Sequence, residues 1–238
     1  MSENEKLETA SRASHILTEL NELEAYINWK LNSDKDKLLT RISEIRAKAS
    51  LLEKEAKEPK LSPTFGTFTD PRDGRTYRTV KIGRQIWLAE NLAFAYAGGK
   101  CYNNDLANEA KYGRLYDWET AKKAVPPGWH LPTKGEWDEL QTLVDKSKLG
   151  YHLKSRTGWN KEDNGDDLLG FSALPGGYGY SDGSFYNVGN GGFWWSASEN
   201  DSYNAYRQFM YYGSEGAFWD IILKSSLFSV RCLQDCVM

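Results

Sequence analysis

The side chains best suited to chemistry in this sequence are aromatic and polar residues gathered between positions 196 and 223. The segment is rich in Tyr, Trp, Phe, Asn, Ser and Gly, a composition typical of antibody contact loops, where rigid rings provide contact area and small polar residues adapt. Alternation along a predicted strand at 205–212 divides its side chains between two faces. One face carries Ala205, Arg207, Phe209 and Tyr211, and the other carries Tyr206, Gln208, Met210 and Tyr212. The pattern predicts a binding surface; the alternative is an ordinary sheet face covered by a loop.

A second polar group surrounds Gly165, and its members are Asp163, Asn164, Asp166 and Asp167. Oxygen ligands around a glycine are typical of calcium loops, but this spacing does not fit the EF-hand pattern. Asp, Asn and Gly are also the commonest turn residues, because their side chains accept hydrogen bonds from nearby amides. We therefore expect a polar turn, with calcium as the alternative; a bound ion would stiffen the loop that leads to Gly170.

Residues that could perform catalysis are scarce. The three histidines and three cysteines lack the paired spacing of a zinc site, and no Ser-His-Asp set, phosphate loop or nucleotide fingerprint occurs. Glu199 and Asp201 lie two positions apart on a predicted loop, which does not indicate the separation of glycosidase carboxylates. Cys232 falls on the last predicted strand, and Cys236 lies in the last three residues, which we expect to fray. We predict no catalytic residue, no metal-histidine site and no cofactor.

Charge and hydropathy exclude two classes of partner. A net charge of -3 without a basic cluster argues against nucleic acid, because phosphate backbones are bound through concentrated positive charge. No stretch approaches the roughly 20 apolar residues of a membrane span. The opening residues 1–6 also lack the apolar core of an export signal.

The composition divides the chain into two parts. Eight of the nine tryptophans follow residue 76, and all seven prolines follow residue 58. We therefore predict a helical stem at 1–58, a linker at 59–66 and one domain at 67–238. The linker contains Pro59 and Pro63, which end the stem helix because proline lacks the amide hydrogen and clashes with the preceding turn.

The stem carries apolar residues at steps of three and four: Ala13, Ile16, Leu20, Leu23, Ile27, Leu31, Leu38, Ile42, Ile45, Ala49, Leu52 and Ala56. This period predicts a helix with one apolar stripe, which must be buried against something. The phase is lost at 32–36, where residues that favour helix caps cluster. Either one long helix forms a coiled coil with copies of itself, or two helices fold back as a hairpin. We favour the homo-oligomer; a further alternative packs the stripe on the chain's own domain.

The second part shows mixed periods. A hairpin is predicted from strands at 77–82 and 85–88 around a Gly83-Arg84 turn. Helices are predicted at 118–124 and from Thr133 to about 144, the second with a capping box between Thr133 and Glu136. Strands follow at 171–174, 193–197, 205–212, 217–223 and 227–233. The order predicts an α+β domain with an antiparallel sheet.

A series of ordered motifs carries a resemblance to a known family. They include TVKIG at 79–83, WLAENL at 87–92, YGRLY at 112–116, PGWHLP at 127–132, GFSALP at 170–175, FWWSAS at 193–198 and SVRC at 229–232. Over residues 67–235 they resemble the Fibrobacter succinogenes major paralogous domain family. The resemblance implies a fold similar to C-type lectins and the formylglycine-generating enzyme, in bacterial surface or secreted proteins of poorly defined activity. A similar sheet carries recognition in the receptor-binding proteins made by diversity-generating retroelements.

The resemblance also orients the predicted strand at 205–212. It implies a bulky apolar residue pointing inward at Phe209, so that Tyr206, Gln208, Met210 and Tyr212 point outward, with Tyr203, Phe218 and Trp219 as neighbours. The predicted function is non-catalytic recognition or adhesion, in which this face binds a glycan or a protein surface and the stem multiplies it. Two alternatives are an enzyme related to formylglycine-generating oxidases and a purely structural surface or assembly protein.

Two departures from the family bear on the compartment. Relatives often carry cysteine at the position of Glu109 or Ala110 and at that of Val125, so Cys101 lacks its usual partner. Relatives also usually begin with an export signal. The cell surface or the exterior, which the resemblance implies, and the cytoplasm therefore both stay open.

Overall fold

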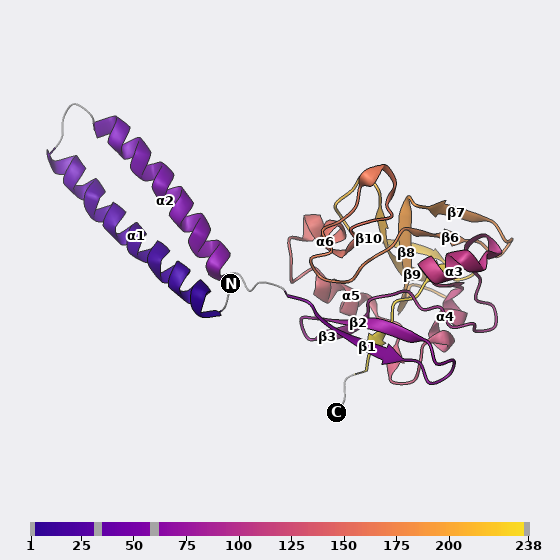
Figure 1. The fold of residues 1–238 in the computed structure, drawn as a ribbon. Coiled ribbons are helices and arrows are strands. Elements are labelled where there is room, and N and C mark those ends of the chain that lie inside the picture. The colour runs from indigo at the N-terminus through magenta and orange to yellow at the C-terminus, as the bar shows by residue number, and fades with distance from the viewer. Residues whose placement is uncertain (1–2, 31–34, 58–61, 236–238) are drawn as a thin grey trace. The chain divides into compact units, whose positions relative to one another are not determined.

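The computed structural model describes residues 3–30, 35–57 and 62–235 (Figure 1). The chain divides into two compact units, Met1–Lys60 and Leu61–Met238. The second unit opens with the strand β1 (Thr64–Thr69), so residues 64–66 belong to it and not to the linker predicted at 59–66. None of the described helices has the length and apolar character needed to cross a membrane.

The first unit is a hairpin of two helices, α1 (Glu3–Lys30) and α2 (Lys35–Lys57), which lie side by side (Figure 1). The side chains buried between them are Ala13, Leu20, Ile27, Ile42 and Ala49. Arg46 of α2 donates to Glu24 Oε2 at 2.5 Å and to Asn21 Oδ1 at 2.9 Å, both on α1. The continuous helix that we favoured is therefore wrong, and the hairpin alternative is what the chain adopts. Of residues 32–36, where the phase was predicted to be lost, 32–34 lie outside the described residues and 35–36 begin α2.

The second unit combines short helices with antiparallel strands, as predicted. Its helices are α3 (Leu106–Tyr112), α4 (Trp118–Ala124), α5 (Lys134–Leu140) and α6 (Leu149–Leu153), with 3-10 turns at Tyr102–Asn104, Lys146–Lys148 and Asn160–Glu162. After β1 its strands are β2 (Thr76–Ile82), β3 (Gln85–Leu88), β4 (Leu115–Tyr116), β5 (Trp129–His130), β6 (Gly176–Gly179), β7 (Phe185–Val188), β8 (Gly191–Glu199), β9 (Asn204–Tyr211), β10 (Phe218–Leu223), β11 (Phe228–Ser229) and β12 (Leu233–Gln234).

These strands form two sheets. The first has the order β1-β2-β3-β12-β5 and is antiparallel throughout. The second has the order β10-β9-β8-β11-β4, and β6 joins it by pairing with β8 and with β7. Because β11 lies in the second sheet and β12 in the first, the end of the chain connects the two.

Several local predictions are confirmed. The β2–β3 hairpin and α4 have the predicted bounds within one residue, and the capping box of α5 is formed, with Thr133 N donating to Glu136 Oε2 at 2.7 Å. Helix α5 ends at Leu140, before the predicted 144. Residues 171–174 are not a strand, because Gly170 and Ser172 have φ angles of 66° and 52°, which interrupt an extended backbone.

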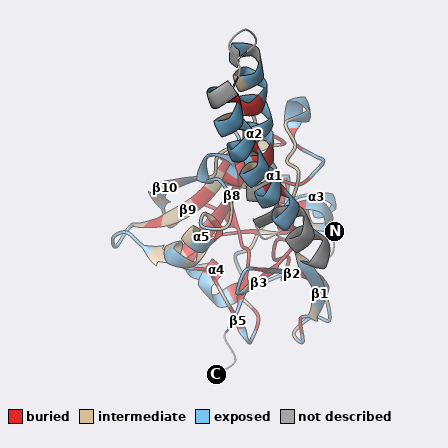
Figure 2. Cartoon of the chain, turned by 90° about the vertical axis from the view of Figure 1, so that its left-hand side faces the viewer, coloured by how far each residue is buried: buried red, intermediate tan, exposed pale blue. Residues whose placement is uncertain are grey.

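The core lies on both faces of β8 and β9 (Figure 2). One face carries Phe193 and Trp195 against Phe228, and the other carries Trp194 and Met210. Tryptophans dominate the interior: Trp87, Trp137, Trp194 and Trp195 are all less than 2% exposed. Burying each large apolar side chain contributes roughly 1.5 to 3 kcal/mol or more, which compensates for the small amount of regular structure.

The family motifs meet at the buried side chain of Asn91. Its Oδ1 accepts hydrogen bonds from Trp194 Nε1 and Arg231 Nε, both at 2.8 Å, and its Nδ2 donates to the carbonyl of Tyr112 at 2.8 Å. Arg231 is fully buried and also donates to the carbonyls of Leu88, Phe171 and Ser172. Burial lowers the pKa of Arg231 to about 9, so the guanidinium still carries its charge at neutral pH. This Asn91–Arg231 network joins five segments that are distant in the sequence.

Candidate functional site

The face on which we predicted binding is covered. Tyr206, Gln208 and Met210 do share one face of β9, but Gln208 is 1% exposed and Met210 is fully buried. Helix α5 covers this face: Trp137 packs on Trp194, the cross-strand neighbour of Gln208. The expectation that Gln208 and Met210 point outward is therefore wrong. Neither amide atom of Gln208 has a hydrogen-bond partner among the described residues.

The other predicted residues are scattered around this sheet. Tyr206 meets the ring of Trp219 edge-on at 6.3 Å, and Trp219 Nε1 donates to Asp138 of α5 at 2.8 Å. Tyr212 is half-buried and packs against the part of the core that contains Trp194 and Met210. Tyr203 is 73% exposed in the turn between β8 and β9, and Phe218 lies on the opposite face of the sheet, beside Phe209. The structure does not bring the seven predicted residues into one surface.

That opposite face carries a continuous series of aromatic rings, here named the aromatic strip. It consists of Tyr180, Tyr186, Tyr178, Phe193, Phe209 and Phe218, and it crosses the strands in the order β7, β6, β8, β9, β10. Ring centroids are 5.8 Å apart for Tyr186 and Tyr178, and 5.0 Å apart for Tyr178 and Phe193. The series continues with 6.1 Å from Phe193 to Phe209 and 5.6 Å from Phe209 to Phe218.

A tight turn places the tyrosines of β6 and β7 together. Gly183 has a φ of 89°, which favours glycine, and Asp182 Oδ1 accepts hydrogen bonds from the amide and the hydroxyl of Ser184 at 2.9 and 2.6 Å. The register then sets Tyr178 opposite Tyr186, so that their side chains lie on the same face.

The aromatic strip is exposed at its ends and has a charged pair beside it. Tyr180, Tyr186 and Phe218 are 37%, 48% and 44% exposed. In the next row of side chains along β9 and β10, the Arg207 guanidinium lies 4.9 Å from the Phe193 ring centroid and donates to Asp220 Oδ2 at 2.7 Å. The Arg207 side chain is 13% exposed and that of Asp220 is 45% exposed. Asp220 is therefore the member of the pair that is open to hydrogen bonds from a ligand.

Tyrosine hydroxyls add neutral hydrogen-bonding groups to this surface. Burial raises the pKa of Tyr178 to about 12, and a hydrogen bond with Tyr180 acts in the same direction. The Tyr178 hydroxyl is therefore protonated at physiological pH and can both donate and accept.

A comparison with protein families decides where this fold belongs. The family model described as the Fibrobacter succinogenes major domain matches residues 80–234, more than half of the chain. The chain belongs to this family. No curated protein and no solved structure matches it. The Fibrobacter major domain extends here from β2 to β12, and it contains the Asn91–Arg231 network and the whole aromatic strip.

In this Fibrobacter major domain the calcium candidates bind different partners. Asp163 Oδ2 accepts from Lys154 Nζ at 2.7 Å, and Asn164 Oδ1 accepts from the amide of Trp159 at 3.1 Å. Asp166 lies 3.1 Å from His152 Nδ1 and also accepts from the amide of Leu168, whereas Asp167 accepts from Ser172. Over residues 3–30, 35–57 and 62–235, no three His, Cys, Asp or Glu side chains are grouped to hold a metal ion. The segment is a polar turn whose side chains bond to neighbouring parts of the domain.

The two described cysteines of this domain, Cys101 and Cys232, are buried thiols. Cys101 Sγ lies 3.3 Å from Glu109 Oε2, so Glu109 stands beside Cys101 where the resemblance implies a cysteine in relatives. Cys232 is fully buried, and burial raises the pKa of its thiol far above the ordinary value. Cys236 lies outside the described residues.

Proposed function

We propose that this chain is a non-catalytic recognition module with a C-type-lectin-like domain, which binds a glycan on the aromatic strip and is presented in several copies by the helical hairpin. The observation that carries the proposal is a row of aromatic rings with exposed ends and a charged pair beside it on one sheet face. Tyr186 lies at one end and Phe218 at the other. Arg207 and Asp220 form an ion pair in the next row of side chains.

This arrangement suits a sugar better than a protein surface. A pyranose offers apolar C–H patches that pack on aromatic faces and hydroxyl groups that need adjacent donors and acceptors. A protein partner needs a broader, flatter apolar patch. Along the aromatic strip the apolar surface is interrupted, because Phe193 is only 3% exposed beneath Arg207.

The state of the cysteines supports the non-catalytic part of the proposal. A reactive cysteine is a partly exposed thiolate in an electropositive site. Cys232 is fully buried with a raised thiol pKa, and the thiol of Cys101 lies beside the carboxylate of Glu109. An oxidase related to the formylglycine-generating enzyme would need a thiolate that is partly exposed and close to positive charge.

The hairpin supports the multivalent part. Its second apolar row, Ile16, Leu23, Leu38 and Ile45, is 39% to 48% exposed. The buried row and this exposed row together make up the apolar spacing of three and four residues. Such spacing is typical of helices that pack against more than one neighbouring helix. Two hairpins joined along these rows would form a four-helix bundle, with each half-exposed side chain contributing about 1 kcal/mol. Several weak sites on one assembly would then gain 10²-fold or more by avidity.

A glycan array, followed by titration of the best binder, tests the ligand site. The Tyr180→Ala/Tyr186→Ala double variant and Phe218→Ala should each weaken binding about tenfold, the loss of roughly one stacking contact. The matched control is Tyr203→Ala, because Tyr203 is exposed but lies outside the aromatic strip. Undiminished binding by folded strip variants would place the site elsewhere. If no glycan binds, and a protein is captured from envelope extract by the wild type but not by the strip variants, the ligand is a protein and not a glycan.

Sedimentation of the full chain tests the assembly. Ile16→Glu/Leu23→Glu should convert an oligomer to a monomer, because burying two carboxylates is unfavourable. Ser14→Glu/Ser43→Glu adds the same charge at exposed polar positions and should leave the oligomer intact. A wild-type monomer at micromolar concentration would contradict the multivalent part and leave the ligand site standing.

A further inference from the structure

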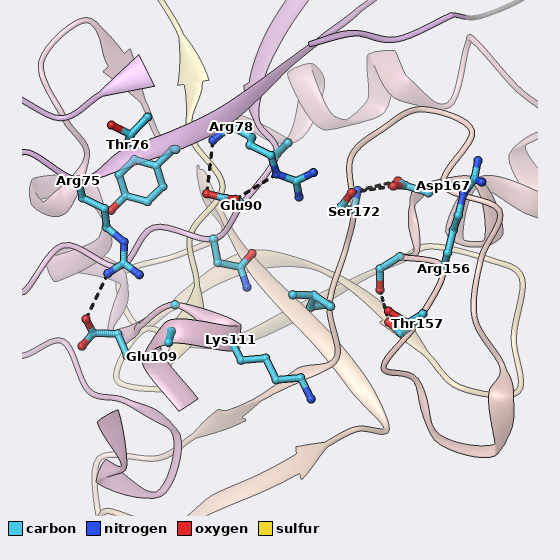
Figure 3. Close-up of a pocket in the computed structure, with 17 residues that line it drawn as sticks. Arg75, Thr76, Arg78, Glu90, Glu109, Lys111, Arg156, Thr157, Asp167 and Ser172 are labelled. Carbon is cyan, nitrogen blue, oxygen red and sulfur yellow. Dashed lines mark hydrogen bonds and ion pairs between the residues drawn. The ribbon is translucent and has the colours of Figure 1, made fainter. Parts of the chain in front are cut away.

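A polar cavity of about 480 Å³ lies in the second unit, apart from the aromatic strip (Figure 3). Its walls come from β2, from the loop after β3, from α3 and from the loops at 155–157 and 167–174. Its volume lies within the range of small-molecule sites, roughly 300 to 1,000 Å³. Apolar side chains contribute little to the lining. The aliphatic ones are Ala89, Ala110 and Leu174, and most of the other lining residues carry polar or charged groups.

This side of the cavity contains two ion-paired arginines and a lysine for which the described residues offer no carboxylate partner. Arg75 and Arg78 contact Glu109 and Glu90 at 3.3 and 3.1 Å, and Arg78 does so through its Nε, which leaves its terminal nitrogens available as donors. The Lys111 ammonium lies 4.8 Å from the ring centroid of Tyr112. Figure 3 shows Lys111 extending from α3 away from Glu109, toward the side of the cavity where Thr157 lies.

The opposite wall carries a further cation and several hydroxyl groups. Arg156 donates its Nε to the carbonyl of Asp166 at 2.9 Å, which leaves its terminal nitrogens without a carboxylate partner within the described ranges. Ser155 and Thr157 lie on the same loop, and Ser172 stands beside Asp167 (Figure 3). The cavity therefore offers cations from two sides and hydroxyl groups between them.

The backbone of this wall is held in position. Asp167 and Ser172 have φ angles of 50° and 52°, a region that costs non-glycine residues about 1 kcal/mol or more. Asp167 accepts hydrogen bonds from the amide and hydroxyl of Ser172 at 2.7 and 2.6 Å, and the Ser172 carbonyl accepts from Arg231 at 3.0 Å. A wall fixed in this way loses little freedom when a ligand binds, which favours affinity.

We propose that this cavity binds an acidic sugar, a hexuronic acid or an oligosaccharide that carries one. The cations select a carboxylate, for which arginine and lysine form charge-assisted hydrogen bonds. The carboxylates of Glu90 and Asp167, which also line the cavity, can accept hydrogen bonds from sugar hydroxyls. A neutral sugar would leave Lys111 and Arg156, which have no carboxylate partner among the described residues, without an anion.

NMR titration of the full chain with sodium glucuronate, with trigalacturonate and with glucose, at constant ionic strength, tests the assignment. We expect saturable shifts with the two acidic ligands at millimolar concentration and none with glucose. A tighter complex with trigalacturonate would identify an oligosaccharide as the source, and equal affinity would identify a single acidic sugar.

Variants locate the binding. Lys111→Gln and Arg78→Gln should each weaken glucuronate binding about tenfold, the loss expected for one charge-assisted hydrogen bond. The matched control Lys123→Gln, on an exposed position of α4, should bind as the wild type does. Tyr180→Ala/Tyr186→Ala should also leave this binding unchanged, so the cavity and the aromatic strip are tested separately. Binding of glucose equal to that of glucuronate, absence of any binding, or wild-type affinity in both cation variants would overturn the proposal.

Discussion

Replacing Lys154 with methionine tests how the loops of the second unit are held together. Lys154 is 2% exposed, and its ammonium donates to Asp163 Oδ2 at 2.7 Å and to the carbonyl of Ser214 at 2.9 Å. The same ammonium lies 4.7 Å from the ring centroid of Trp159. It therefore ties the polar turn at 163–167 to the turn between β9 and β10. Methionine keeps the side-chain volume and the contact with the ring but removes both hydrogen bonds.

The expected loss follows from these contacts. Removing one partner of a fully buried ion pair costs about 3 to 5 kcal/mol. The Asp163 side chain is 36% exposed and keeps a hydrogen bond from the amide of Gly213, so solvent compensates part of its loss. The Ser214 carbonyl loses a charged donor, which costs about 1 to 3 kcal/mol. We expect the free energy of unfolding to fall by about 2 to 3 kcal/mol.

Urea unfolding followed by tryptophan fluorescence measures this loss, because eight of the nine tryptophans lie in the second unit. Lys154→Met, Asp163→Asn and the double variant form a cycle that isolates the coupling between the two side chains, which we expect to be about 1 to 2 kcal/mol. A loss below about 0.5 kcal/mol with an unchanged m-value would refute the reasoning. Such a result would show that the desolvation cost of burying the Lys154 charge is as large as the stabilisation from its hydrogen bonds.

Three further predictions concern the rest of the domain. Arg231→Met should lower the free energy of unfolding by about 3 to 5 kcal/mol, because buried carbonyls lose their donor; a loss below about 1 kcal/mol in the same urea assay would contradict this. Glu109→Cys should form a disulfide with Cys101 on oxidation, detected as loss of two free thiols, whereas persistent thiols would show that the two backbones are too far apart. Burial alone would raise the pKa of Glu136, but hydrogen bonds led by those from Thr133 lower it overall. Its stabilising effect is therefore present above its unfolded pKa and lost as pH falls through the lowered value, so Glu136→Gln should flatten the decline in stability below about pH 5 in acid unfolding curves; an unchanged decline would contradict this.

Local signals in the sequence predicted elements whose stabilising contacts are close in the chain. The turn at Gly83 and the capping residues Thr133 and Glu136 each act within a few positions, so β2, β3 and the start of α5 could be predicted. Contacts between residues that are distant in the sequence could not be predicted in this way, as the stem shows. Its period predicted helices, but the choice between one helix and a hairpin depends on contacts such as Arg46 to Glu24, which are 22 positions apart.

The binding face was mispredicted for a physical reason. Alternation along β9 identifies which residues share a face, but it does not say which face is covered. Both faces carry aromatic or apolar residues, and Gln208, which the resemblance implied to point outward, is buried beneath α5. Only the position of α5, which depends on Trp137 and Trp194, decides the matter.

The aromatic strip could have been found in part. Asp182-Gly183 between Tyr178 and Tyr186 is a hairpin signal, because this dipeptide favours the turn that joins two strands. The contact between Tyr178 and Phe193, however, depends on the parallel pairing of β6 with β8. Strand β7 lies between β6 and β8 in the sequence, and no local motif indicates that β6 and β8 pair in parallel.

The Asn91–Arg231 network has a consequence for how this domain can vary. Four of its hydrogen bonds end on main-chain oxygens, those of Leu88, Tyr112, Phe171 and Ser172. A carbonyl oxygen is present whichever side chain the residue carries. The network therefore fixes the main-chain path at these four positions without depending on their side chains. Leu88 and Phe171 are themselves fully buried, so freedom of composition belongs to the exposed positions of the loops. A frame of this kind can present different exposed side chains on the same main-chain path.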